Sequence, residues 1–160
     1  PPAQAKIAYE MLRAAGVPCL ISQYRYSMFD RTVEEKSLPL AAEQGSGFIA
    51  FSPLAQGLLT KKYLHGIPEH SRAARSTGFL KVDQVTEDKV GKARRLDEIA
   101  ARRGQTLAEM ALAWVLKDER MTSVIVGTSS VKQLADNLHA LDNLNFTNEE
   151  LAEIEGILRL

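Results

Sequence analysis

The sequence predicts an α/β fold built around a parallel β-sheet. Three short apolar runs have the length of strands, and segments with helical periodicity separate them along the 160 residues. Strands that alternate with helices pair in parallel, because the crossover between two parallel strands is long enough to hold a helix. Three strands are too few for a doubly wound sheet or a closed barrel. We therefore expect residues 1–160 to form one domain, the C-terminal portion of a (β/α)8 TIM barrel. This portion would contain about strands six to eight, their helices and a C-terminal helix, without the N-terminal half.

The first half of the chain contains two of these strands. Apolar residues recur every three to four positions over residues 3–15, which predicts a helix. The β-branched and aromatic run at 17–27 has strand character. A second helix is expected over 32–44, where Pro39 interrupts the pattern. The run "FIAFS" at 48–52 is continuously apolar, as expected for a parallel strand that is buried on both faces.

The second half begins with a segment, 60–85, that has no clean period and is expected to be a long loop. A helix is expected over 86–103, ending at Gly104. Thr106 and Glu109 have the spacing of a capping box, in which each side chain bonds the backbone amide of the other residue at the start of a helix. We therefore expect another helix to follow Thr106.

The third strand is expected at 122–127. The helix that follows it carries the apolar residues Val131, Leu134, Leu138 and Leu141. Thr147 and Glu150 form a second capping-box pattern, so a last helix is expected to begin there. Trp114 lies on the apolar face of an earlier helix and is expected to pack in the core.

Composition and charge argue against several classes of partner. Twenty Lys and Arg balance twenty Asp and Glu, so no net field draws the chain to nucleic acid or to a membrane. No apolar run reaches the roughly 18–20 residues that span a bilayer. The single cysteine, Cys19, is expected to be a small core residue in a reduced, cytoplasmic protein. His65, His70 and His139 lack a second ligand at metal spacing, so no metal site is expected. The chain begins on Pro-Pro within a helical pattern, so we expect it to be a piece of a longer protein. Assembly with further copies of the same chain into a homo-oligomer is compatible with the sequence.

Polar or small residues follow each strand at its carboxyl end, at 23–27, 51–57 and 127–130. In (β/α) barrels the functional groups lie at these ends, and phosphate sites commonly form after the last two strands. Residues 127–130 precede a helix, whose first amides have no intrahelical partner and attract anions. The alternative is that Ser130 only caps this helix, with Gln133 completing a capping box.

The carboxyl end of the second strand is the more specific signal. Pro53 has no backbone N–H to donate to a neighbouring strand, so the strand ends there. Gly57 has no side chain and permits a close approach of a ligand to the backbone. Phe51 could present a flat face to an aromatic ligand, or it could be a core residue. Five basic residues and one acid then lie between positions 60 and 82. Of these, Lys62 and Arg72 could hold a phosphate, unless the loop is merely solvated.

Three segments resemble the aldo-keto reductase family. They are "ISQYRYSMFDR", "IAFSPLAQGLLTKKYLHGIPEHSRA" and "VIVGTSSVKQLADNLHAL", which are similar to the sixth, seventh and eighth strand regions of that family. The resemblance covers essentially the whole chain. It is greatest to bacterial reductases that resemble L-glyceraldehyde 3-phosphate reductase, which are relatives of the potassium-channel β-subunits.

The resemblance implies that this chain binds NADP(H). Gln23 would bond the nicotinamide carboxamide, and Phe51 would stack on the nicotinamide ring. Lys62 and Arg72 would contact phosphate and favour NADP(H) over NAD(H). The residues that match the turn around the pyrophosphate are Ser52, Pro53, Leu54, Ala55 and Gln56. Those that match the adenosine end are Gly127, Ser129 and Gln133 near its phosphate, and Asp136 and Asn137 at the adenine.

The implied activity is hydride transfer from the nicotinamide to a small-molecule carbonyl substrate of unknown identity. In the family, the Tyr, Lys, Asp and His that assist this step come from the first half of the barrel. No catalytic residue is therefore expected here, and Tyr24, Tyr26 and Tyr63 are not at matching positions. Two alternatives share the same cofactor residues: a non-catalytic NADP(H)-binding regulatory subunit of the channel β-subunit type, and an inactive truncated fragment.

Overall fold

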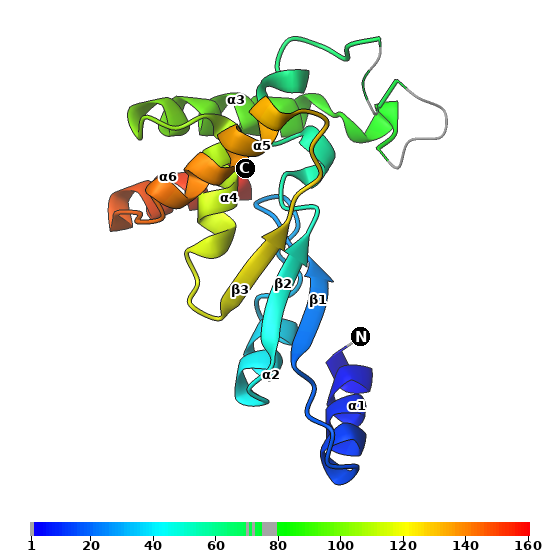
Figure 1. Cartoon of the computed structure of the whole chain (residues 1–160). Coiled ribbons are helices and arrows are strands. Elements are labelled where there is room, and N and C mark those ends of the chain that lie inside the picture. The colour runs from blue at the N-terminus through cyan, green and yellow to red at the C-terminus, as the bar shows by residue number, and fades with distance from the viewer. Residues whose placement is uncertain (1, 70, 72, 75–79) are drawn as a thin grey trace.

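The computed structural model describes residues 2–69, 71, 73–74 and 80–160. In this part of the chain, three parallel strands form one sheet in the order β1-β2-β3, with the central strand bonded on both sides (Figure 1). The strands are β1 (Ile21–Arg25), β2 (Gly47–Phe51) and β3 (Met121–Ile125). The mixed α/β class and the parallel sheet are therefore confirmed.

Helices flank the sheet and separate its strands. Their bounds are α1 (Pro2–Ala14), α2 (Ser37–Glu43), α3 (Glu87–Arg102), α4 (Leu107–Leu116), α5 (Val131–Leu138) and α6 (Asn148–Arg159). Short 3-10 turns are η1 (Ala55–Gly57), η2 (Lys61–Tyr63), η3 (Val82–Gln84) and η4 (His139–Asp142). No helix within the described ranges is long and apolar enough to cross a membrane.

Threonine side chains cap three of the helices at their starts. Thr106 and Glu109 bond each other's amides at 3.2 and 2.8 Å, so the predicted capping box of α4 is confirmed. The same reciprocal pair forms at Thr147 and Glu150 before α6. Thr86 accepts a hydrogen bond from the third amide of α3, which places that helix where periodicity predicted it.

Some predicted boundaries were too wide. Only residues 21–25 of the run at 17–27 form a strand. The helix expected over 32–44 covers only 37–43, because Pro39 lies in its first turn, where the missing N–H costs nothing. Cys19 is half-exposed beside Ser46 rather than buried in the core, so that prediction was wrong.

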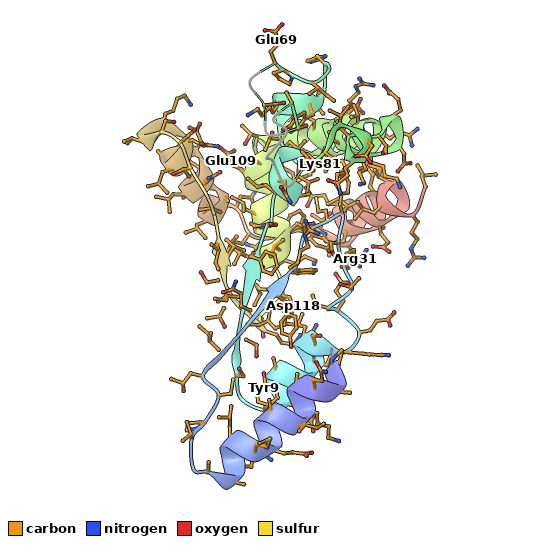
Figure 2. All side chains as sticks on the ribbon, turned by 90° about the vertical axis from the view of Figure 1, so that its right-hand side faces the viewer. Tyr9, Arg31, Glu69, Lys81, Glu109 and Asp118 are labelled. Carbon is orange, nitrogen blue, oxygen red and sulfur yellow. The ribbon has the colours of Figure 1, made fainter. Side chains whose placement is uncertain are left out.

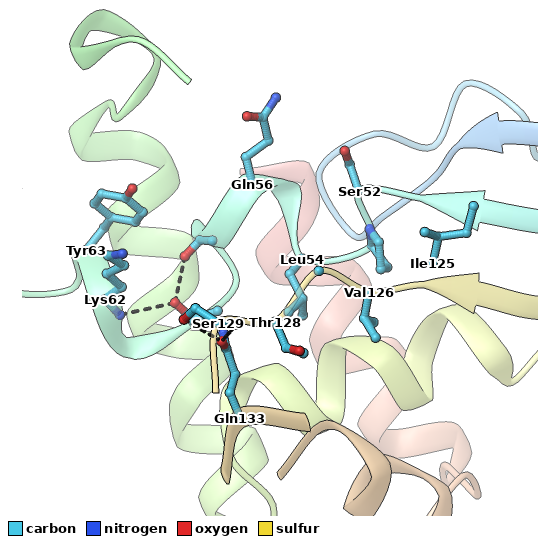
Figure 3. Close-up of a pocket in the computed structure, with 14 residues that line it drawn as sticks. Ser52, Leu54, Gln56, Lys62, Tyr63, Ile125, Val126, Thr128, Ser129 and Gln133 are labelled. Carbon is cyan, nitrogen blue, oxygen red and sulfur yellow. Dashed lines mark hydrogen bonds between the residues drawn. The ribbon is translucent and has the colours of Figure 1, made fainter. Parts of the chain in front are cut away.

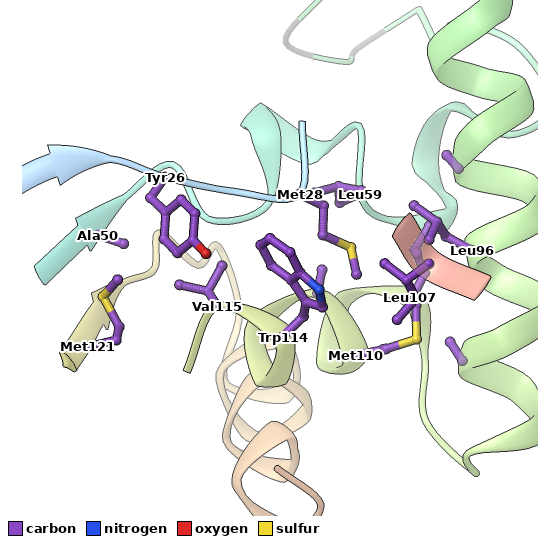
Figure 4. Close-up of a cluster of buried hydrophobic side chains, with 14 of the residues drawn as sticks. Tyr26, Met28, Ala50, Leu59, Leu96, Leu107, Met110, Trp114, Val115 and Met121 are labelled. Atoms are coloured by element: carbon purple, nitrogen blue, oxygen red, sulfur yellow. The ribbon is translucent and has the colours of Figure 1, made fainter. Parts of the chain in front are cut away.

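Helices cover one face of the sheet, and the core lies between them and that face (Figure 4). Phe48 and Ala50 of β2 are fully buried there, and Tyr24 of β1 stacks on Phe48 with ring centroids 5.1 Å apart. Trp114 of α4 is 2% exposed, so its packing role is confirmed. Its ring lies 5.7 Å from that of Tyr26, just beyond β1.

The other face of the sheet is exposed. In parallel pairing, register partners point their side chains to the same side, and Arg25, Phe51 and Ile125 are such partners. Phe51 is 37% and Ile125 is 45% exposed, and Gln23 is also exposed. We expected β2 to be buried on both of its faces. In the described part of the chain only the face with Phe48 and Ala50 is buried, and the face with Phe51 is open.

Ion pairs tie the loop after β1 to the C-terminal helix. Arg31 lies next to the C-terminal helix (Figure 2). It donates to Glu34 at 2.8 Å and also to Glu155 of α6. Asp30 lies 3.8 Å from Arg25. The hydrogen bond from Arg31 is the main cause, and that from Arg159 the second, that lowers the pKa of Glu155 below its usual value. The Arg31–Glu155 ion pair is therefore intact at neutral pH and is lost as the pH falls and the carboxylate is protonated.

The turn after β2 holds an unusual backbone. Ser52, Ala55 and Gln56 have φ values of 54°, 47° and 60°, a region that costs energy for residues with a side chain. Gly57 follows with φ 101°, and a Cβ there would lie 3.3 Å from the Tyr63 ring. The turn is therefore held in this shape by the surrounding packing.

We expect Ile99→Ala to lower the free energy of unfolding by about 3 kcal/mol, because Ile99 is 1% exposed and its removal leaves a cavity. Val131→Ala is the matched control: Val131 is 87% exposed, so a change below about 0.5 kcal/mol is expected. Urea unfolding followed by circular dichroism measures both. Equal losses in the two variants would contradict this assignment of the core.

We expect Gly57→Ala to destabilise the protein by about 1–3 kcal/mol, because alanine resists the φ of this position and its methyl group meets Tyr63. Gly91→Ala in α3 is the control, since a methyl group there meets nothing and alanine favours helix, with a gain of up to about 1 kcal/mol. Thermal unfolding distinguishes the opposite signs. A stabilised Gly57→Ala variant would show that the turn is relaxed.

Candidate functional site

A cavity of about 440 Å³ opens at the carboxyl ends of β2 and β3 (Figure 3). Three segments contribute to its wall: the turn after β2, the η2 region, and the stretch from the end of β3 into α5. Of the predicted site residues, it brings together Ser52, Pro53, Leu54, Gln56, Lys62, Gly127, Ser129 and Gln133. Ser52 and Gln133, the two ends of this set, lie 81 positions apart in the sequence, and the parallel sheet makes them neighbours.

The turn after β2 supplies backbone donors to the cavity. Leu54 has φ −94° and ψ 17°, and the left-handed Ala55 and Gln56 follow it. A right-handed residue followed by left-handed ones forms a concavity of N–H groups, called a nest, that binds anions. Within the described chain, the amides of Leu54 and Gln56 have no hydrogen-bond acceptor, whereas Ala55 and Gly57 donate to Ser52 and Leu54 carbonyls.

The start of α5 supplies a second set of donors. Ser130 caps the helix by accepting from the Gln133 amide at 3.1 Å. The predicted capping box is only half correct, because the Gln133 side-chain oxygen accepts from the amide of Ser129 at 2.9 Å instead of that of Ser130. The amides of Val131 and Lys132 have no acceptor in the described part of the chain. The amino end of α5 therefore has unpaired N–H donors and is the positive end of the helix dipole.

Two adjacent lysines differ in their environment. Lys61 pairs with Asp97 of α3 at 3.4 Å. Lys62 lines the cavity, and no carboxylate in the described ranges pairs with its ammonium. Thr60 fixes the direction of this segment, since its hydroxyl donates to the Gly57 carbonyl at 2.7 Å and accepts from the Lys62 amide at 3.2 Å. Lys62 is thus the available cation of the pair.

Several predicted site residues lie elsewhere. Gln23 and Phe51 are on the open face of the sheet rather than in the cavity wall, and Ala55 faces a smaller neighbouring cavity. Asp136 lies further along α5 and pairs with Lys132 at 2.8 Å. Arg72, together with His70 and Arg75, lies outside the described residues.

Asn137 is a distinctive member of the predicted set. It is 8% exposed, and its Nδ2 atom is buried without a hydrogen-bond partner in the described chain. An unpaired buried donor costs about 1–3 kcal/mol, so such a group is expected to have a ligand or another partner. Asn137 therefore carries a buried amide group whose desolvation no hydrogen bond in the described chain offsets.

Other residues in the cavity wall escaped the sequence analysis. They are Thr60, Tyr63, Ile125 and Val126, whereas Thr128 belongs to the segment 127–130 that the sequence had singled out. Tyr63 is 1% exposed, and its hydroxyl accepts from the Ala73 amide at 3.4 Å, so its ring supports the wall from within. The signal for Thr60 was available, because a threonine two residues before Lys62 is a typical cap of a short helical turn.

Comparison with known proteins gives a consistent result. The aldo/keto reductase family model matches residues 3–159. The chain is 46% identical over 158 residues to the L-glyceraldehyde 3-phosphate reductase of Escherichia coli O157:H7, which covers 96% of this chain and 46% of that protein. It is 44% identical over the same span to the protein of that name from Escherichia coli strain K12.

The chain thus spans about half the length of the curated relatives it matches. The match nevertheless includes β1, β2 and β3 and every residue of the cavity. On this match, the chain belongs to the aldo/keto reductase family.

Proposed function

We propose that the protein is an NADP(H)-dependent aldo-keto reductase and that this chain supplies its cofactor-binding half, strands six to eight of the barrel. The observation that carries the proposal is the cavity between β2 and β3. It combines the unpaired amides of the turn after β2, the amino end of α5 and the ammonium of Lys62, and none of the described residues in its wall is a carboxylate. Such a site suits the phosphates of a dinucleotide.

The residues present fit this cofactor along its length. The pyrophosphate would accept from the Leu54 and Gln56 amides, and the start of α5 would hold the adenosine phosphate. The orphaned Nδ2 of Asn137 suits an adenine nitrogen, after local adjustment of α5. Lys62 would select the 2′-phosphorylated cofactor, because a second dianion is best stabilised by a free cation. When bound, the nicotinamide supplies the hydride that reduces a carbonyl group.

The open face of the sheet would orient the nicotinamide. Phe51 presents its ring there, and Gln23 lies on the same face one strand away. An exposed aromatic ring next to the phosphate turn positions a flat heterocycle by stacking and excludes water from one of its sides. The groups that protonate the carbonyl oxygen would come from the remaining strands of the barrel. We propose small-molecule aldehydes as substrates, since both relatives are named as reductases of an aldehyde phosphate.

Lys62→Ala is expected to weaken NADPH binding about tenfold or more, because it removes a charge-assisted contact to phosphate. NADH affinity should change much less, since NADH lacks the extra phosphate. Titration of the nicotinamide fluorescence of each cofactor with the purified protein measures both constants.

Lys61→Ala is the matched control. It removes the same charge one residue away, but from an ammonium that already pairs with Asp97, so NADPH affinity should stay within about twofold. Equal losses in the two variants would point to a general charge effect. An unchanged affinity in Lys62→Ala would remove the lysine from the site.

A further inference from the structure

A second cavity, of about 130 Å³, adjoins the first. Gln56 belongs to the walls of both. The second cavity lies between the loop after β1, the η1 turn, the η3 turn and the start of α3. Its volume is below the roughly 300–1,000 Å³ of sites for drug-sized ligands, so it suits a small group rather than a dinucleotide.

Arg25 gives this cavity its chemical character. It is the last residue of β1 and the register partner of Phe51, so the two side chains leave neighbouring strands on the same open face. The side chain of Arg25 is 49% exposed. A ligand whose reacting end lies against Phe51 would therefore have a guanidinium beside it.

A second cation lines the same cavity. Lys89, in the first turn of α3, lines the cavity, and its ammonium donates to the Gln84 carbonyl at 3.3 Å. Only one of its three donors is used in that bond. Among the described residues of the wall, Asp30 is the single carboxylate. It lies 3.8 Å from Arg25, a distance at which the pair lacks a close hydrogen bond.

The remaining polar groups are neutral. Gln56 and Gln84 contribute amides, and the Ser27 hydroxyl is buried against the Phe29 amide. Two cations and two amide side chains around one carboxylate form a site for a small dianion. The fork of Arg25 matches the oxygens of a phosphate better than a lysine would.

We propose that this second cavity binds the phosphate monoester of a small carbonyl substrate, with Arg25 as its principal ligand and Lys89 as its second cation. The inference rests on the proposed function, because Phe51 locates the nicotinamide end of the cofactor. The carbonyl group then lies over the open face beside Phe51, and the phosphate at the far end of the substrate enters the cavity. The cofactor keeps its own phosphates in the larger cavity.

Calorimetric titration of glycerol 3-phosphate into the protein saturated with NADPH tests this assignment. NADPH occupies the first cavity, so the probe reports on the second.

Arg25→Gln is expected to weaken binding of the probe about tenfold or more while leaving NADPH affinity unchanged. Asp30→Asn should strengthen it by a few-fold, since it removes the competing carboxylate. Glycerol, which lacks the phosphate, should not bind detectably, and glycerate should bind more weakly than glycerol 3-phosphate.

Two further variants separate this inference from the proposed function. Arg13→Gln removes an arginine of α1 that bonds Gln44 instead of lining either cavity, and it should change neither affinity. Lys62→Ala should weaken NADPH but not glycerol 3-phosphate. Circular dichroism and the urea midpoint verify that each variant is folded.

The outcomes are distinct. Binding of glycerol 3-phosphate that is unaffected by Arg25→Gln overturns the second cavity as its site, and so does the absence of such binding in a protein that binds NADPH. Glycerate binding as tight as that of glycerol 3-phosphate overturns the phosphate assignment. A protein that binds glycerol 3-phosphate through Arg25 but does not bind NADPH overturns the proposed function instead.

Discussion

Parallel pairing through the central strand β2 is the constraint on which the rest of the structure depends. Hydrogen bonds to β1 on one side and β3 on the other align the carboxyl ends of all three strands at one edge of the sheet. Segments that are distant in sequence therefore meet there. The strand ends supply backbone donors to the larger cavity and a guanidinium to the smaller one, and neither arrangement exists without the shared register.

The strained turn after β2 links the fold to the chemistry. A relaxed turn would return its amides to neighbouring carbonyls, whereas the left-handed residues here leave the amides of Leu54 and Gln56 unpaired. The burial of nearby apolar side chains offsets the conformational energy of these left-handed residues, since Leu59 and Tyr63 are almost completely buried. Strain of this kind is typical of binding sites, because the donors are set in place before the ligand arrives.

The one-sided packing of the sheet explains why so many site residues are exposed. Phe51, Gln23 and Arg25 share the face that the described helices do not cover, while the buried face holds the aromatic core. The family match and the span of about half of the relatives agree with a sheet that is part of a larger barrel. In our proposal, the open face is where cofactor, substrate and the remaining strands meet.

Local chemistry in the sequence determined the helix starts at Thr86, Thr106 and Thr147 and the end of β2 before Pro53, because caps and turn residues act over a few positions. The alternation of strands and helices along the chain determined the parallel pairing of the strands. The tertiary structure alone decided which of Lys61 and Lys62 is free, since the partner Asp97 comes from a helix more than thirty residues away. It also decided that Gln133 bonds Ser129, that Asp136 pairs with Lys132, and that Arg25 stands beside Phe51. Ion pairs and strand register join residues that sequence spacing does not relate, so only the folded chain reveals them.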